Sequence, residues 1–199
     1  MPPHRDLAAF DERAPRYDTG WLGKLHHEIA DRTAALALER SPSPQVVLDI
    51  GCGTGYLLRA FARRCPGAQE LTGVDPSPAM VQLAASSVGD PRLRFRTGSA
   101  ERLSFPAGTF DLVVSTTSFD HWSDQQAGLN ECARVLRPGG RLVLVDQFSW
   151  WLVPTLLAGR RGKARTKRRA TRLLLAAGFR SAEWVDVRAV IIKAVTALR

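Results

Sequence analysis

The chain has 199 residues, of which 45% are hydrophobic and 24% are charged, proportions that are ordinary for a globular domain. The length suits one domain over residues 1–199, and no repeat or linker divides it. No apolar run approaches the roughly 20 residues that span a bilayer, and residues 1–11 hold no apolar core of a secretory signal. Three scattered cysteines lack metal-ligand spacing, which predicts free thiols, no metal site and a cytoplasmic location.

The net charge of +9 comes from one segment. Between Gln147 and Ala182 there are nine bases and no acids, and without these nine the chain holds 19 bases against 19 acids. The basic run at 160–172 has three interpretations: a solvated face, a surface that attracts an acidic substrate, or a nucleic-acid contact.

The hydropathy pattern predicts alternating helices and strands. A short helix at 7–13 lies in a polar arm, and a longer one at 21–40 has apolar residues from Leu22 to Ala37 at helical spacing. We expect strands at 46–50, 71–75, 93–97, 110–115 and 141–146, with helices at 56–64, 78–86, 124–136 and 164–177. The last two strands, 182–187 and 189–196, are so close in sequence that they must be antiparallel. The predicted fold is α/β: a doubly wound, mostly parallel seven-stranded sheet with a C-terminal antiparallel hairpin.

The first strand leads into a glycine turn, in which Asp49 is followed by Gly51, Gly53 and Gly55. A Cβ at these glycines would hold a ligand away from the backbone. Dinucleotide sites prefer G-x-G-x-x-G and place a pyrophosphate at the helix N-terminus. Here the spacing is G-x-G-x-G, and the Asp49 carboxylate would repel a pyrophosphate, so a cationic ligand is favoured. An ordinary structural turn is the remaining interpretation.

Five segments in order resemble the class I S-adenosylmethionine-dependent methyltransferases. They are the D-x-G-x-G-x-G turn, the acid Asp75 at the end of the second strand, and the stretches 98–105, 110–122 and 136–142. The resemblance covers about residues 45–147, and the small-molecule branch related to ubiquinone and menaquinone methylation is the nearest type. It implies S-adenosylmethionine as methyl donor and S-adenosylhomocysteine as product.

The resemblance also implies a set of cofactor-binding residues. Asp75 would bind the ribose hydroxyls, although the following Pro-Ser-Pro also suits a helix cap. Ser99 stands where the family commonly has an acid facing the adenine amino group, and it offers a weaker acceptor. Tyr17, in the sequence A-P-R-Y-D, resembles a lid residue, so residues 1–40 would form a lid over a core at 41–199; plain packing is the alternative. The implied residues are Tyr17, Asp49, Gly51, Cys52, Gly53, Gly55, Asp75, Pro76, Ser99, Ala100, Glu101 and Ser115.

Methyl transfer mainly requires an acceptor held in line with the sulfonium. A hydroxyl acceptor also benefits from a general base, for which His121 is the candidate, while Asp120 could bind or orient the acceptor. Trp150 and Trp151 could line an acceptor pocket or anchor their loop. No metal is needed, so activity should resist chelators. The oligomeric state is left open.

The leading function is therefore methylation of a small molecule, with a hydroxyl as one acceptor. A nucleic-acid methyltransferase is a second hypothesis, which the basic 160–172 segment suggests. Enzymes that methylate exocyclic base amines typically show [DNS]-P-P-[YFW] after the fourth strand, where this chain reads S-T-T-S at 115–118. A third hypothesis is a protein that binds S-adenosylmethionine without turning it over.

Overall fold

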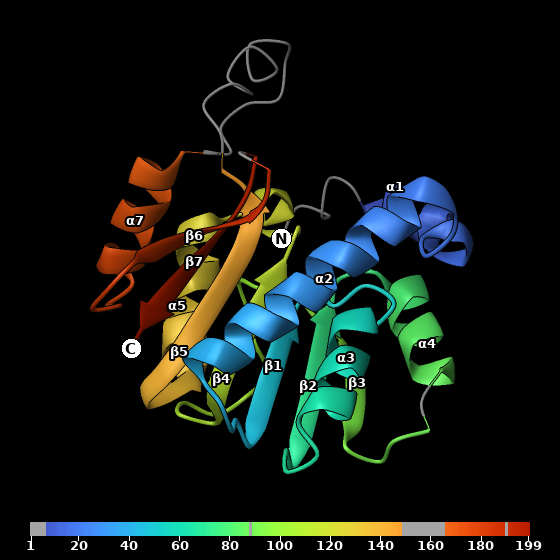
Figure 1. Ribbon diagram of the computed structural model, residues 1–199, viewed down its shortest axis with the longest axis horizontal. Coiled ribbons are helices and arrows are strands. Elements are labelled where there is room, and N and C mark those ends of the chain that lie inside the picture. The colour runs from blue at the N-terminus through green and yellow to red at the C-terminus, as the bar shows by residue number, and fades with distance from the viewer. Residues whose placement is uncertain (1–6, 88, 149–165, 190) are drawn as a thin grey trace.

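The computed structural model describes residues 7–87, 89–148, 166–189 and 191–199 (Figure 1). It is built around one seven-stranded sheet, whose first five strands pair in parallel and whose last two pair antiparallel. This confirms the expected fold class. The strands are β1 Val46–Ile50, β2 Glu70–Asp75, β3 Leu93–Thr97, β4 Phe110–Thr116, β5 Leu136–Gln147, β6 Glu183–Arg188 and β7 Ile192–Leu198, in the sheet order β3-β2-β1-β4-β5-β7-β6.

Helices cover both faces of this sheet. α2 (Gly20–Arg40) and α3 (Tyr56–Arg64) pack on one face, whereas α5 (Gln125–Val135) and α7 (Lys167–Ala176) pack on the other. α4 (Pro78–Ser86) contacts β2 and β3. An arm of α1 (Leu7–Arg13) and the 3-10 turn η1 (Ala14–Arg16) precedes α2, and a second 3-10 turn, η2 (Phe119–His121), follows β4.

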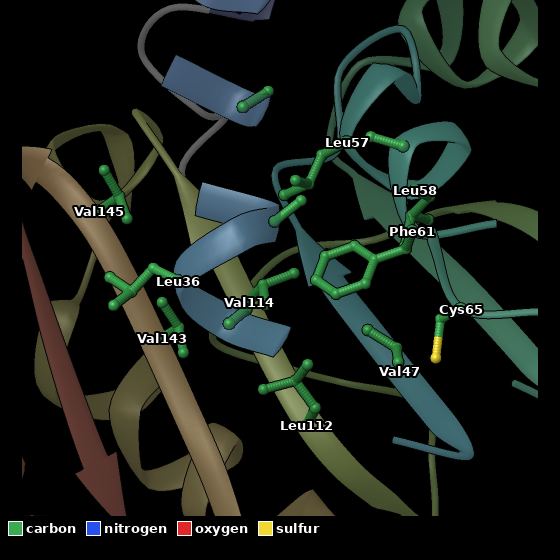
Figure 2. Close-up of a cluster of buried hydrophobic side chains, with 14 of the residues drawn as sticks. Leu36, Val47, Leu57, Leu58, Phe61, Cys65, Leu112, Val114, Val143 and Val145 are labelled. Carbon is green, nitrogen blue, oxygen red and sulfur yellow. The ribbon is translucent and has the colours of Figure 1, made fainter. Parts of the chain in front are cut away.

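The sheet face under α2 and α3 forms a continuous apolar core (Figure 2). Phe61 of α3 is fully buried with Val47 of β1 and Val114 of β4, and Leu36 of α2 joins the same cluster. Full burial of one such side chain is worth about 1.5–3 kcal/mol. This core holds α2 in place and with it the residues that α2 presents at the end of the sheet.

The bounds of β5 and of the final hairpin differ from the expected ones, and so does the buried part of α2. β5 begins at Leu136 rather than at 141, because Leu136 already pairs with Phe110 of β4. Three residues, 189–191, join β6 to β7, and Ala189 has a positive φ of 49° in this turn. In α2 most of the buried residues lie between Ile29 and Ala37, whereas Leu22 in the first turn is 59% exposed. Helical spacing alone does not show where the sheet beneath a helix ends.

The strand order reverses between β1 and β4, which is where doubly wound sheets bind ligands, outside the carboxyl ends of the strands. The three cysteines are free and buried. Within the described ranges, no helix combines the length and the apolarity needed to cross a membrane.

Candidate active site

The glycine turn after β1 has a positive φ at all three glycines: 75° at Gly51, 52° at Gly53 and 81° at Gly55. A Cβ on Gly51 would lie 2.4 Å from the Ser118 side chain, and one on Gly55 would lie 2.6 Å from the Phe95 ring. A Cβ on Gly53 would meet only Tyr17, at 3.9 Å. The expectation that every glycine keeps a ligand close is therefore corrected: packing within the protein excludes a side chain at two of them, and Gly53 is the one that opens toward the cleft.

Asp75 closes this turn from the neighbouring strand. Its Oδ2 accepts a hydrogen bond from the Gly53 amide at 2.9 Å, and its Oδ1 accepts one from the Ser77 amide at 2.9 Å. Ser77 in turn caps α4, because its Oγ accepts from the amide of Met80. Asp75 thus serves the local turn and at the same time lines the cleft.

Asp49 lies beneath the turn and is 2% exposed. Its Oδ1 has no hydrogen-bond partner. Burial, and then the negative charge of Asp75, raise the pKa of Asp49 to about 8. A desolvated carboxyl group of this kind is stabilised in its ionised form by a cation, which agrees with the preference that the sequence indicates.

The arm covers the turn. Tyr17 lies over Gly53, and the next residue, Asp18, accepts a hydrogen bond from the Thr54 hydroxyl at 3.1 Å and pairs with His27 of α2 at 3.0 Å. Nearer its start, the arm is tied to the core by a hydrogen bond from Ser77 to Asp11. These contacts bring a segment that is remote in sequence onto the ligand edge of the sheet.

The cleft at this edge has two lobes, which share five lining residues. Lobe A, of about 610 Å³ including space open to solvent, extends toward β2 and η2. Lobe B, of about 430 Å³ by the same measure, extends beneath α2. The residues that line both lobes are Tyr17, Gly51, Gly53, Thr116 and Thr117. Lobe A is also lined by Phe10, Ile50, Asp75, Pro76, Met80, Gly98, Ser99, Ala100, Glu101, Ser118, His121 and Trp122. Lobe B is also lined by Asp18, His26, His27, Ala30, Asp49, Cys52, Thr54, Tyr56 and Leu57.

Ten of the twelve residues that the sequence assigns to the cofactor line these lobes. The exceptions are Gly55, whose missing side chain makes room for Phe95, and Ser115, which is fully buried with its Oγ 2.7 Å from the Ser118 Oγ. The two loop residues predicted to contact the acceptor, Trp150 and Trp151, lie outside the described residues.

His121, the last residue of η2, lines lobe A beside Phe10 of the arm. Its Nε2 lies 3.2 Å from Oδ1 of Asp120, and its imidazole forms a T-shaped contact with the Phe10 ring at a centroid distance of 5.1 Å. Asp146, buried beneath, accepts a hydrogen bond from the amide of Asp120 at 3.2 Å. Burial, and then the charge of Asp120, raise the pKa of Asp146. An imidazole beside a carboxylate, held on an anchored turn, is suited to accept a proton.

Several lining residues were not assigned from the sequence. Thr116, Thr117 and Ser118 lie within the stretch 110–122 that resembles the family, and their position at the end of β4 could have identified them. Phe10 and His26 could not have been found in this way. They lie on helices α1 and α2, and nothing in the sequence around them shows that these helices bring them to the ends of the strands.

The residues fit S-adenosylmethionine. The unpartnered Asp49 oxygen suits its ammonium group, the open face of Gly53 lets a ligand approach the backbone, and lobe A is of a size typical for such sites. Among the described residues, no three His, Cys, Asp or Glu side chains are grouped as a metal site would require.

Together, the reversed strand order, the acid-flanked glycine turn and the carboxylate at the end of β2 define a class I S-adenosylmethionine-dependent methyltransferase domain. A family model described as a methyltransferase domain matches the chain over residues 47–140.

The sequences of relatives agree with this class, and a solved structure shares the fold. The demethylmenaquinone methyltransferase of Thermus thermophilus is 39% identical over 144 residues, which are 69% of this chain and 63% of that protein. The ubiquinone/menaquinone biosynthesis C-methyltransferase of Geobacter sulfurreducens is 36% identical over 149 residues, 71% of this chain and 57% of that protein. The chain thus spans less than two thirds of the length of these relatives. A putative methyltransferase of Haloferax volcanii, solved with the Trm112 methyltransferase activator, shares the fold with a TM-score of 0.79 at 24% identity, covering 95% of this chain and 96% of its own.

Proposed function

We propose that the protein transfers a methyl group from S-adenosylmethionine to a small-molecule acceptor, and that the acceptor is a hydroquinone-type ring. The observation that supports this best is that His121 lines the same lobe as Gly53 and Asp75. The lobe therefore places a proton acceptor beside a site whose groups suit the donor. The names of the relatives from Thermus and Geobacter add the acceptor class and a carbon as the methylated atom.

The bound donor supplies an electrophilic methyl group on sulfur, and the rest of the chemistry belongs to the chain. The glycine turn and Asp75 would orient the donor, and the arm from Phe10 to Asp18 would close over it as a lid and exclude water. His121, held by Asp120, would take the proton of an acceptor hydroxyl. Ionising a ring hydroxyl raises the electron density on the ring carbons beside it, so the same base serves methylation at carbon or at oxygen. Methylation at carbon further requires that the proton on that carbon leave, to the base or to solvent, and that the ring oxygen take up a proton again, which restores the aromatic hydroquinone. The sequence alone left the methylated atom open, with a hydroxyl oxygen as one possibility, whereas the names of the relatives favour carbon.

A turnover screen tests the proposal. The purified chain is mixed with S-adenosylmethionine and, in turn, a 1,4-naphthohydroquinone lacking the ring methyl group, a simple catechol and a transfer RNA, each with and without EDTA. We expect S-adenosylhomocysteine release with the naphthohydroquinone, unaffected by EDTA, and mass and NMR spectra that show a new C-methyl group.

The other outcomes separate the alternatives. An O-methyl product would keep the class and overturn the carbon assignment. Methylation of the RNA alone would support the nucleic-acid hypothesis, for which α7 offers exposed Lys167, Arg168, Arg169 and Arg172. Tight binding of S-adenosylhomocysteine with no turnover on any acceptor would support a binding protein without transferase activity.

A further inference from the structure

The first turn of α2 presents two large apolar side chains to solvent. Trp21 is 70% exposed and the adjacent Leu22 is 59% exposed, the two highest values for large apolar side chains among the described residues. Single exposed apolar residues are ordinary on a protein surface, whereas an adjacent pair that includes a tryptophan is typical of an interaction surface.

The packing of the helix start explains this exposure. Gly23 is buried, and a Cβ on it would lie 2.3 Å from the backbone of Asp18. Asp18 in turn accepts a hydrogen bond from Thr54 in the glycine turn. The inward face of α2 is therefore occupied by the arm and the turn, and Trp21 and Leu22 are left outside these contacts.

Exposed bases surround the apolar pair. Arg13 and Arg16 precede it in the arm, and Lys24 lies one helical turn after Trp21 on the same face of α2. Within residues 7–24 these three bases are exposed, against one exposed acid, Glu12. The three bases, Trp21 and Leu22 are called the α2 surface below.

The α2 surface adjoins the cleft. Tyr17, which directly follows Arg16, lines both lobes, and α2 starts beyond the carboxyl ends of the strands (Figure 1). The helix α7 begins at the same edge of the sheet and carries the exposed bases Arg168 and Arg169. The edge that holds the cleft thus combines exposed apolar side chains with positive charge.

This combination matches the chemistry of an anionic lipid surface. A tryptophan ring favours the depth of the lipid headgroups, apolar side chains beside it enter the acyl region, and bases attract acidic headgroups. We propose that the α2 surface docks on an anionic bilayer, with the cleft edge of the sheet facing the membrane. The inference goes beyond the proposed function, because docking requires neither the methyl donor nor the acceptor.

A second copy of the chain fits this surface less well. In a symmetric dimer the same patch meets itself, so the three bases of one copy would face those of the other. Acidic headgroups neutralise these bases instead.

Sedimentation with vesicles tests the proposal, with the full chain and no methyl donor or acceptor. One set of vesicles contains equal amounts of phosphatidylglycerol and phosphatidylcholine, and the other contains phosphatidylcholine alone. The apolar pair is tested by the double variant Trp21→Ser and Leu22→Ser. Its control is Leu175→Ser, because Leu175 is also exposed, at 53%, but lies in the last turn of α7.

A second pair of variants tests the charges. Arg16→Gln combined with Lys24→Gln removes two bases from the α2 surface. Arg63→Gln combined with Arg94→Gln is the control, because it removes the same charge from exposed positions at the end of α3 and the start of β3, at the opposite edge of the sheet.

We expect the wild type to bind the phosphatidylglycerol vesicles about tenfold more tightly than those of phosphatidylcholine alone. The serine double variant should lose about tenfold in affinity for the acidic vesicles, also at high salt, where attraction between charges is screened. Leu175→Ser should stay within twofold of the wild type. The charge variant of the α2 surface should lose clearly more affinity than its control.

Three results would overturn the docking surface and leave methyl transfer untouched: no binding of the wild type to acidic vesicles, equal losses for the two serine variants, or equal losses for the two charge variants. A wild-type dimer in light scattering that the serine double variant dissociates would assign the α2 surface to a second copy, and would overturn the lipid assignment.

Discussion

Asp75, the last residue of β2, and Gly53, in the turn that follows β1, are joined by a 2.9 Å hydrogen bond from the glycine amide to the carboxylate. The carboxylate expected to face a ribose is thus also part of the glycine turn. A ligand that binds Asp75 contacts a group that is already oriented, which reduces the entropy lost on binding.

Replacing Asp75 with Asn tests this double role. Both of its carboxylate oxygens accept from backbone amides, so an Asn must turn its NH₂ group toward an N–H. We expect a loss of about 1–3 kcal/mol in the free energy of unfolding and a clear loss of affinity for 5′-methylthioadenosine, which carries the ribose of the donor, measured by urea unfolding and calorimetry. Asp124→Asn is the control, because Asp124 caps α5, where Asn is equally suitable. Retention of wild-type affinity by Asp75→Asn would show that the turn needs only the shape of the side chain.

Two glycines of the same turn should respond differently to alanine. At Gly51 the new Cβ would lie 2.4 Å from Ser118, so we expect a loss of about 3 kcal/mol or more in unfolding free energy. At Gly53 no atom lies closer than 3.9 Å, so only the positive φ is penalised, by about 1 kcal/mol. The Gly53 variant should instead lose S-adenosylhomocysteine affinity more than tenfold. Equal stability losses for the two variants would contradict this division.

The raised pKa of Asp49 predicts a dependence of binding on pH. In the free protein this carboxyl has a pKa of about 8, so it is largely protonated at pH 7. Binding of an ammonium group favours the ionised form, so the affinity for S-adenosylhomocysteine should rise as the pH increases from 6 to 8. The Asp49→Asn variant should bind S-adenosylhomocysteine weakly, with an affinity that does not change over this pH range. A flat wild-type curve would exclude Asp49 as the partner of the cation.

The same residue should limit the stability of the free protein. Because the pKa is raised in the folded state above its ordinary value of 3.8, the folded chain holds more protons between pH 4 and pH 8, and stability falls as the pH rises through this range. Asp49→Asn should therefore stabilise the free protein by about 2–4 kcal/mol at pH 8 and hardly at all at pH 4. Thermal unfolding at both pH values measures the difference, and equal shifts at both would refute it.

His121→Ala tests the general base. We expect kcat with the naphthohydroquinone to fall by about 10²–10⁴, while the affinity for S-adenosylhomocysteine stays within twofold. The loss should shrink at high pH, where the acceptor hydroxyl ionises without help. Full turnover of the variant at saturating acceptor would remove His121 from the chemistry.

Tyr17→Ala tests the lid. Loss of the ring over Gly53 should weaken the binding of S-adenosylhomocysteine and of methylthioadenosine by about tenfold, since aromatic packing of this kind is worth roughly 0.5–1.5 kcal/mol beyond its buried area. Tyr17→Phe keeps the ring and should bind almost as the wild type does. If alanine leaves both affinities unchanged, the arm is ordinary packing and not a lid.

The sequence by itself determined the elements, the sheet with its C-terminal hairpin and the class of cofactor. These depend on local patterns: apolar runs of strand length, helical spacing, and an acid followed by glycines at intervals of two. The glycine turn and Asp75 are recognisable because each comes directly after a strand, and parallel strands bring their carboxyl ends to one edge.

The tertiary structure decided which of these residues face the ligand and which face the protein. It assigned Gly51 to Ser118 and Gly55 to Phe95, it buried Ser115, and it brought His26 of α2 to the lobe that Asp49 lines. These relationships join positions far apart in the chain, and they depend on how α2 and the arm pack on the sheet. A local hydropathy pattern carries no information about contacts between distant positions, so these contacts are seen only in the folded structure.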